Sequence, residues 1–110
     1  MNLNMEFAMD NNLDVKDITV ISLLDLISKE KGKDEFDFSY SEIINHLPFI
    51  FNGASMQSNT VRLRRILDKE GMQNFVTRTI RNEGPHKGRI LTFKLNKENI
   101  KKLNVEGIVN

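Results

Sequence analysis

Three arginines lie within four positions near the middle of the chain, in the segment SNTVRLRRIL at residues 58–67. Arg62, Arg64 and Arg65 come before the nearest following acid, Asp68. A guanidinium is always charged, and its planar fork of donors matches phosphate oxygens or the O6 and N7 atoms of guanine. A solvated helix face would also accommodate arginines, but it does not require three of them without an acid. The segment therefore favours recognition of a polyanion.

Polar side chains suited to nucleic-acid recognition surround these arginines. Amides and hydroxyls just before them can read adenine or bind phosphate near a positive helix end, and a valine can contact a thymine methyl. Because Arg62 and Arg65 are one helical turn apart, we expect both on the face that enters a major groove, with Arg64 on its flank. The candidate set in this segment is Gln57, Ser58, Asn59, Val61, Arg62, Arg64 and Arg65.

A second basic cluster surrounds the loop NEGPHKG at residues 82–88. Apolar and polar residues alternate at 75–81 and 89–95, which predicts a two-stranded hairpin with Leu91, Phe93 and Leu95 on one face. The loop glycines would let the turn approach a nucleic-acid backbone or minor groove closely, and Pro85 would limit its freedom before binding. The candidate binding residues of this hairpin are Arg78, Arg81, His86, Lys87 and Arg89.

The formal charge of +1 hides a strong asymmetry along the chain. Residues 1–51 carry four Lys and ten Asp or Glu, a net charge of −6, whereas residues 52–94 carry nine Lys or Arg and three acids, a net charge of +6. Such an asymmetry favours one face that meets a polyanion, while the other meets solvent or a basic partner. The alternative is that the two blocks neutralise each other within the fold.

The remaining pattern predicts the elements that would hold these clusters. Apolar residues recur at helical spacing at Ile18, Ile21, Leu24 and Ile27, with Asp17 as the N-cap and Gly32 as the stop. Phe36 and Phe38 alternate with Asp37, which predicts one short strand. Ser39 and Glu42 form a capping box at the start of a second helix, which Pro48 ends near Leu47.

The basic segment predicts a third helix at about residues 56–70. This helix should bury one side and stop at Gly71, and its inward residues are expected to be Met56, Thr60, Leu63, Ile66 and Leu67. Asn96 then caps a short helix in KENIKKL, with Ile100 and Leu103 turned inward. Residues 1–16 have weak periodicity and are expected to form a frayed or partner-ordered segment, and residues 104–110 a tail.

The order of these elements, together with two short patterns, resembles the winged helix-turn-helix family. In that family the recognition helix ends with an apolar residue, a few charged residues, a glycine and a second apolar residue. This chain has a similar pattern in Leu67, the charged residues 68–70, Gly71 and Met72. A Gly-Arg pair before alternating apolar residues leads out of the wing, as at residues 88–91. The resemblance covers residues 17–103 and implies an α+β fold: a three-helix core, a short strand, a hairpin wing and a short C-terminal helix.

Two features depart from the pattern of that family. Arg64 stands where the recognition helix usually has an apolar residue, so the helix is expected to be rotated or less deeply packed. The connection between the second and third helices contains Phe49, Ile50 and Phe51 and is longer than the usual tight turn. These three residues fill the core, begin the third helix early or form part of a dimer surface; core packing is the simplest of these alternatives.

Other chemistry finds little support in the sequence. Asp10, Asn12 and Asp14 imitate the start of a calcium loop, but the positions that require glycine and a bidentate glutamate hold other residues. GPHKGR lacks the spacing of a phosphate-binding loop. His46 and His86 are far apart and no cysteine accompanies them, so no metal site is expected. No nucleophile and base stand out, and we predict a non-enzyme without a cofactor.

The resemblance implies sequence-specific binding of double-stranded DNA by a transcriptional regulator, through the helix at about 56–70 and the wing at about 75–95. Within this class, an accessory protein for plasmid or mobile-element transfer or replication is the alternative. A winged-helix module for protein–protein interaction is the alternative from another class, and an RNA binder lacks stacking aromatics. No apolar run approaches the ~20 residues that span a bilayer, so a cytoplasmic protein is expected. A homodimer, and a protein partner for the acidic half, remain open.

Overall fold

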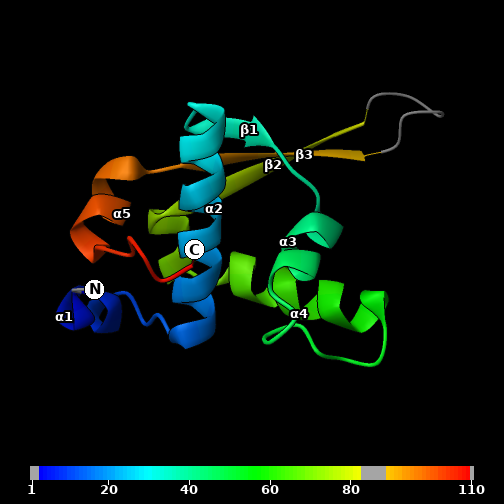
Figure 1. Ribbon diagram of the computed structural model, residues 1–110, viewed down its shortest axis with the longest axis horizontal. Helices are drawn as coiled ribbons and strands as arrows, with labels where there is room; N and C mark the ends of the chain where they lie inside the picture. The colour runs from blue at the N-terminus through cyan, green and yellow to red at the C-terminus, as the bar shows by residue number, and fades with distance from the viewer. Residues whose placement is uncertain (1–2, 83–88, 110) are drawn as a thin grey trace.

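Helix α2 (Val15–Lys31) lies at the centre of the fold, and the other elements surround it (Figure 1). The computed structural model describes residues 3–82 and 89–109, which contain five α-helices and a three-stranded sheet. Val20, Ile21 and Leu24 in α2 are fully buried. Polar residues of the same helix, among them Ser22 and Ser28, are buried too, so α2 contacts other elements on nearly every side.

The ends of α2 are set by local hydrogen bonds. Gly32 ends the helix in the left-handed conformation with φ 66°, as predicted. The predicted N-cap was wrong: Asp14 caps the helix, and its carboxylate accepts a hydrogen bond from the Asp17 backbone N–H. Asp17 occupies the third helical position and accepts from the Asp14 N–H in return. This reciprocal capping box lets the helix begin three residues earlier than the apolar pattern indicated.

The sheet is antiparallel and has the order β1–β3–β2, with β1 at Glu35–Asp37, β2 at Val76–Asn82 and β3 at Arg89–Leu95. Phe93 of β3 is opposite Phe36 of β1 on one side and Arg78 of β2 on the other. Leu91, Phe93 and Leu95 are all buried, so these strands present one apolar face to the core. The predicted short strand and the two predicted hairpin strands are therefore confirmed.

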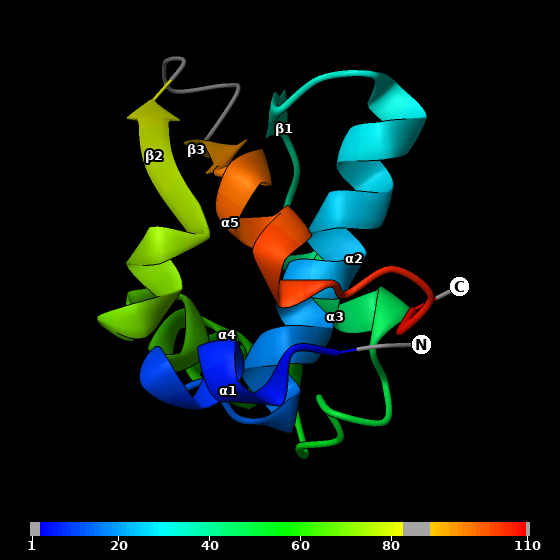
Figure 2. The same ribbon diagram turned by 90° about the vertical axis from the view of Figure 1, so that its left-hand side faces the viewer.

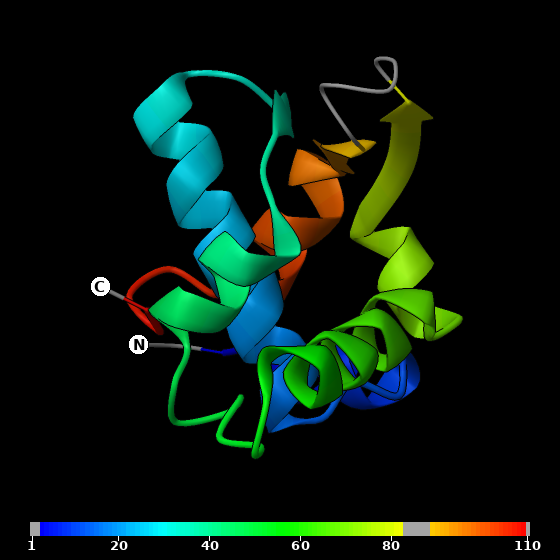
Figure 3. The same cartoon turned by 90° about the vertical axis from the view of Figure 1, so that its right-hand side faces the viewer.

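Helices α3 (Tyr40–His46) and α4 (Met56–Asp68) follow β1. The predicted capping box of Ser39 and Glu42 is present at the start of α3. Ser55 caps α4 in the same manner with Ser58. The first turn of α4 and the outer ends of β2 and β3 extend towards the same side of the molecule, the right in Figure 1, and Figure 3 shows this side facing the viewer.

The predicted role of Gly71 was wrong. Helix α4 ends at Asp68, and Gly71 opens the 3-10 turn η1 (Gly71–Asn74) instead of ending a helix in a left-handed conformation. A Cβ atom at residue 71 would lie 1.8 Å from the backbone oxygen of Asn11. Glycine is therefore required here because two segments distant in sequence touch backbone to backbone.

The N-terminal segment differs from the frayed end predicted by its weak periodicity. Helix α1 (Met5–Asp10) is capped by Asn4 and lies beside α5 (Lys97–Leu103), as Figure 2 shows. The Asn4 N–H donates to the Leu103 carbonyl at 3.0 Å, and the Phe7 ring packs edge-on against Phe75 at 5.7 Å. Helix α5 and its Asn96 cap were predicted correctly, including the buried Ile100 and Leu103.

The α+β class predicted from the sequence is confirmed. One core joins α2, the inner face of the sheet and the inward faces of α3, α4 and α5, and its fully buried side chains include Phe75, Phe93 and Ile21. Within the described residues, no helix combines the length and apolar character needed to cross a membrane.

Candidate nucleic-acid interface

Helix α4 separates an apolar face from a basic one. Leu63, Ile66 and Leu67 are buried against the body of the protein, because residues three and four apart share a helix face. The outward residues are Gln57, Val61, Arg62, Arg64 and Arg65, and all five are exposed. Helical spacing alone indicates that the three arginines lie on the outward side of α4, so their exposure was predictable from the sequence.

The three arginines of α4 differ in what they contact. Arg64 and Arg65 are exposed, and they form no hydrogen bond or ion pair with any residue that the structure describes. The Arg62 Nη1 donates to Asn52 Oδ1 at 3.4 Å, which holds it against the loop before the helix. Because Leu63, Ile66 and Leu67 supply the apolar contacts of α4, Arg64 lies at the surface and displaces none of them.

Two residues predicted at the leading end of the interface have structural roles. Asn59 is 7% exposed, and its Oδ1 accepts the Gly53 N–H at 2.8 Å. The Ser58 hydroxyl forms the capping box with Ser55. The predicted burial of Met56 was also wrong, since this side chain is 45% exposed in the first turn of α4. Among the three polar residues that begin the set, Gln57 is the one directed outward.

The apolar connection between α3 and α4 divides between the core and the surface. Phe51 is 4% exposed and belongs to the core, and Ile50 packs against that core. Phe49 is 68% exposed. The expectation of core packing therefore holds for Phe51, whereas an early start of α4 does not occur, because the helix begins at Met56.

Arg78 of β2 points into the protein. Its Nε donates to the Tyr40 hydroxyl at 2.9 Å, its Nη2 contacts the Asp68 carboxylate at 2.7 Å, and its guanidinium lies 5.9 Å from the Tyr40 ring centre. Burial opposes the charge, but the hydrogen bonds to Asp68 and Tyr40 outweigh it and raise the pKa of Arg78. Arg78 thus joins β2 to α3 and α4, a role that its basic character did not reveal.

The structure describes some of the other candidate residues of the hairpin but not all of them. Arg81 donates from Nη2 to both carboxylate oxygens of Asp37, at 3.3 and 3.1 Å, and both side chains are about half exposed. Arg89 begins β3, paired with Asn82. His86 and Lys87 lie outside the described residues. Ile80 of β2 is 55% exposed near the same end of the hairpin.

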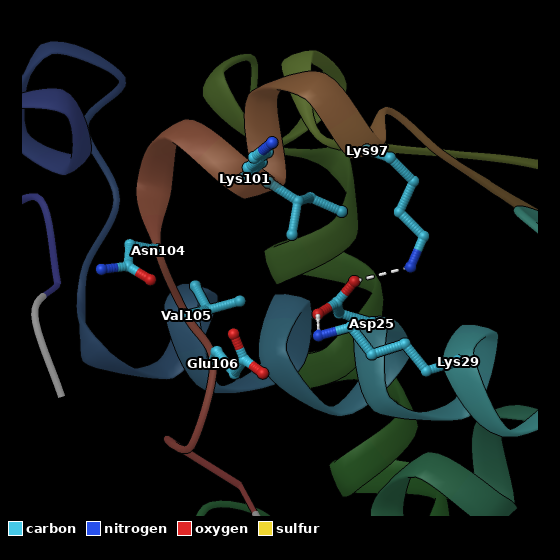
Figure 4. A pocket seen from close by; sticks show the side chains of 8 residues that line it. Asp25, Lys29, Lys97, Lys101, Asn104, Val105 and Glu106 are labelled. Carbon is cyan, nitrogen blue, oxygen red and sulfur yellow. Dashed lines mark hydrogen bonds and ion pairs between the residues drawn. The ribbon is translucent and has the colours of Figure 1, made fainter.

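Acids of the N-terminal half pair with bases of the C-terminal half. Lys69 contacts Asp17 and, at 3.9 Å, Asp14, while Arg81 pairs with Asp37. The Asp25 carboxylate receives Lys97 at 2.6 Å and Lys29 at 3.1 Å in a cleft of about 320 Å³ between α2 and α5 (Figure 4). The two charge blocks therefore neutralise each other in part, but not at the α4 arginines.

A second cleft, of about 510 Å³, separates the first turn of α2 from α4. We call it the α2–α4 cleft; its charged residues are Asp14, Lys16, Asp17, Arg62, Arg65 and Lys69. Burial raises the pKa of the Asp17 carboxyl more than the hydrogen bond from Lys69 lowers it, and the same hydrogen bond raises the pKa of Lys69. Lys16 and Lys69 were missed in the sequence, because nothing local links the start of α2 to α4.

No cluster of three or more histidine, cysteine or acidic side chains suited to a metal ion occurs in residues 3–82 and 89–109. Comparison with known proteins found no match to this chain among protein-family models, curated proteins or solved structures.

Proposed function

We propose that the protein binds double-stranded DNA in a sequence-specific manner as a transcriptional regulator with a winged helix-turn-helix fold. In this proposal α3 and α4 form the helix-turn-helix, α4 is the recognition helix, and β2 and β3 form the wing. The observation that carries the proposal is the outward face of α4, where Arg64 and Arg65 are exposed without a partner among the described residues.

The dimensions of α4 suit a major groove. Its 13 residues span about 20 Å, and the groove is about 12 Å wide, so one face and the leading end can reach base edges. Gln57 lies in the first turn, and Val61 and Arg64 follow it at helical spacing. An amide reads adenine, a valine methyl contacts thymine and a guanidinium reads guanine, so these residues can distinguish base pairs.

The hairpin supplies the second contact. The ends of β2 and β3 extend on the same side as the first turn of α4 (Figure 1), so one duplex can reach both. Arg81 is the described hairpin cation best placed for a phosphate, since it is half exposed and Asp37, its partner, is also near the surface. Arg78 is not part of this contact, because Tyr40 and Asp68 occupy it.

The proposed function is tested by measuring the binding constant for random-sequence duplexes and for duplexes from the source genome at several salt concentrations. Each neutralised phosphate makes log K fall against log salt with a slope of about −0.9, so contact by helix and wing together predicts a slope several times steeper. A binding constant that does not change with salt, or no binding at low salt, contradicts the proposal.

A protein-interaction module is the second candidate, and exposed apolar residues favour it. Met5 and Met9, one turn apart on α1, are 58% and 69% exposed, and Val15 at the start of α2 is 78% exposed. Glu6 and Asp10 lie on the same short helix, so a basic, apolar protein surface would complement it. A chain that retains partner binding after Met5→Ser and Met9→Ser, but loses it after Arg64→Ala, would exclude this use of α1.

A further inference from the structure

We propose that the α2–α4 cleft seats a backbone phosphate of duplex DNA, held by Lys16, Arg62 and Arg65. The inference rests on the proposed function and specifies how the duplex is held beside the recognition helix. It also divides the α4 arginines by role: Arg62 positions the DNA, whereas Arg64 reads a base.

The cleft collects cations from two elements that are distant in sequence. Arg62 and Arg65 lie one turn apart on α4, and Lys16 lies in the first turn of α2 across the cleft. The buried side chains of Phe51 and Ile66 form its apolar floor. Side chains from both walls can therefore reach one anion that enters between them.

The charge balance of the cleft remains positive after its internal pairs are counted. Asp17 is fully buried and pairs with Lys69, whose ammonium also faces Asp14. The cleft holds four cations and two acids, a net charge of +2: Asp14, Lys16, Arg62 and Arg65 remain beside the pair of Asp17 and Lys69, and each is exposed. The backbone N–H groups of Asp14 and Asp17 are satisfied by the reciprocal capping box, so the proposed contacts are made by side chains.

Arg62 is positioned for a phosphate contact. Its Nη1 donates to Asn52 Oδ1, and the neighbouring loop is fixed by the buried Phe51 and by the hydrogen bond from the Gly53 N–H to Asn59. A guanidinium has five N–H donors, so one contact of this kind leaves several for an anion. Holding the group in advance reduces the entropy that binding would cost.

The direction of Arg62 also separates it from the base-reading face. Successive residues of an α-helix are rotated by about 100°, so Arg62 and Arg64 point about 200° apart around α4. A helix inserted in a groove about 12 Å wide has a sugar–phosphate strand along each flank. The flank that carries Arg62 and faces Lys16 therefore meets one of these strands, whereas Val61 and Arg64 lie nearer the bases.

Lys16→Ala is the most informative substitution, because Lys16 is exposed on α2 and lies outside the recognition helix. Removing one phosphate contact should weaken binding about five- to tenfold at 0.1 M salt for every duplex sequence, and should reduce the salt slope by about 0.9. Arg62→Ala should behave in the same way. Lys102→Ala, which removes an exposed cation from α5, is the matched control and should change neither quantity.

Asp14→Asn should change the DNA affinity in the opposite direction, towards tighter binding. Asparagine caps a helix about as well as aspartate, so α2 is retained, while a negative charge beside the cleft is lost. Binding to all duplexes should then become tighter by a severalfold factor. Thermal unfolding of each variant, followed by circular dichroism, verifies that the fold is intact.

Neutral methylphosphonate linkages, placed one at a time in a bound duplex, locate the phosphate. A methylphosphonate at one position should weaken the binding of the native chain, but it should weaken the binding of the Lys16→Ala variant little further. The cleft proposal is overturned if Lys16→Ala and Arg62→Ala bind as the native chain does, or if Arg62→Ala changes the preferred base at one position. In both cases DNA binding itself would stand; a native chain that binds no duplex at low salt would overturn both proposals.

Discussion

At the scale of single residues, the partners of a basic side chain decide whether it can bind another molecule. Arg78 and Arg64 are both arginines of the basic half, yet Arg78 is held by Tyr40 and Asp68 while Arg64 forms no hydrogen bond or ion pair with a described residue. Sequence alone could not separate them, because the contacts of Arg78 come from two other elements. The structure thus removes Arg78 from the candidate site and retains Arg64.

Arg78→Ala should lower the free energy of unfolding by about 1–3 kcal/mol, since the side chain is 14% exposed and two hydrogen bonds to α3 and α4 are lost. The exposed Asp68 can return to water, which keeps the loss near the lower end. Arg64→Ala should change the same quantity by less than about 0.5 kcal/mol. Chemical denaturation of both variants measures this contrast, and equal losses would contradict the structural role of Arg78.

Asp17 combines a helix-capping role with an ion pair at a buried position. It accepts the Asp14 N–H and a hydrogen bond from Lys69, and its side chain is 1% exposed. Burial disfavours the ionised carboxyl and raises its pKa, and this effect exceeds the lowering by the hydrogen bonds from Lys69 and the Asp14 N–H. The folded chain therefore binds the Asp17 proton more tightly than the unfolded chain does.

This pKa shift predicts a pH dependence of stability. A group with a raised pKa in the folded state favours folding increasingly as pH falls from its folded pKa to its unfolded value of about 4. Native protein should therefore gain stability relative to Asp17→Asn over that window, since asparagine retains the capping oxygen but does not titrate. Urea unfolding at successive pH values measures the difference. A relative loss of stability as pH falls would mean that the attraction of Lys69 exceeds the effect of burial.

At the scale of elements, the predictable parts were those defined by neighbouring residues. Ser39 with Glu42, Gly32 and Asn96 mark helix ends through local hydrogen bonds or backbone conformation, and each was predicted correctly. The alternation of Leu91, Phe93 and Leu95 likewise identified the buried face of β3.

Elements that depend on distant contacts were not predictable. Helix α1 has little apolar periodicity, and it is held by Leu103 and Phe75, which are far along the chain. The role of Gly71 has the same origin, because a close approach to Asn11 fixes it. The partner of Asn59 is nearer, since its Oδ1 accepts the N–H of Gly53 in the loop before α4, but nothing in the local pattern indicated this contact. Residue type gives no indication of such partners.

Gly71→Ala tests the contact between η1 and the end of α1. Its Cβ would lie 1.8 Å from the Asn11 carbonyl oxygen, so backbone must move and unfolding should become easier by more than about 2 kcal/mol. Gly32→Ala is the control: its φ of 66° costs about 1–2 kcal/mol, but the added Cβ meets no atom within 4 Å. If Gly71→Ala is the milder variant in urea unfolding, the two segments do not touch as described.

At the scale of the whole molecule, folding converts a charge asymmetry along the sequence into a surface with a smaller basic region. Ion pairs from Asp17 to Lys69, Asp25 to Lys97 and Asp37 to Arg81 use acids of the first half to neutralise bases of the second. Among the described residues of 52–94, three of the bases without an acidic partner, Arg62, Arg64 and Arg65, lie on α4. The proposed interface is therefore narrower than the net charge of +6 in residues 52–94 indicated.

The proposed function requires the outward face of α4 to read a DNA sequence. Selection of bound duplexes from a random library, carried out with the native chain and with Arg64→Ala, Gln57→Ala and Lys102→Ala, measures this reading. The native chain and Lys102→Ala should enrich the same motif, while each α4 variant should lose preference at one or two base positions, worth about 1–3 kcal/mol each. Enrichment of no motif by the native chain, or of one unchanged motif by every variant, would mean that the outward face of α4 does not read a DNA sequence.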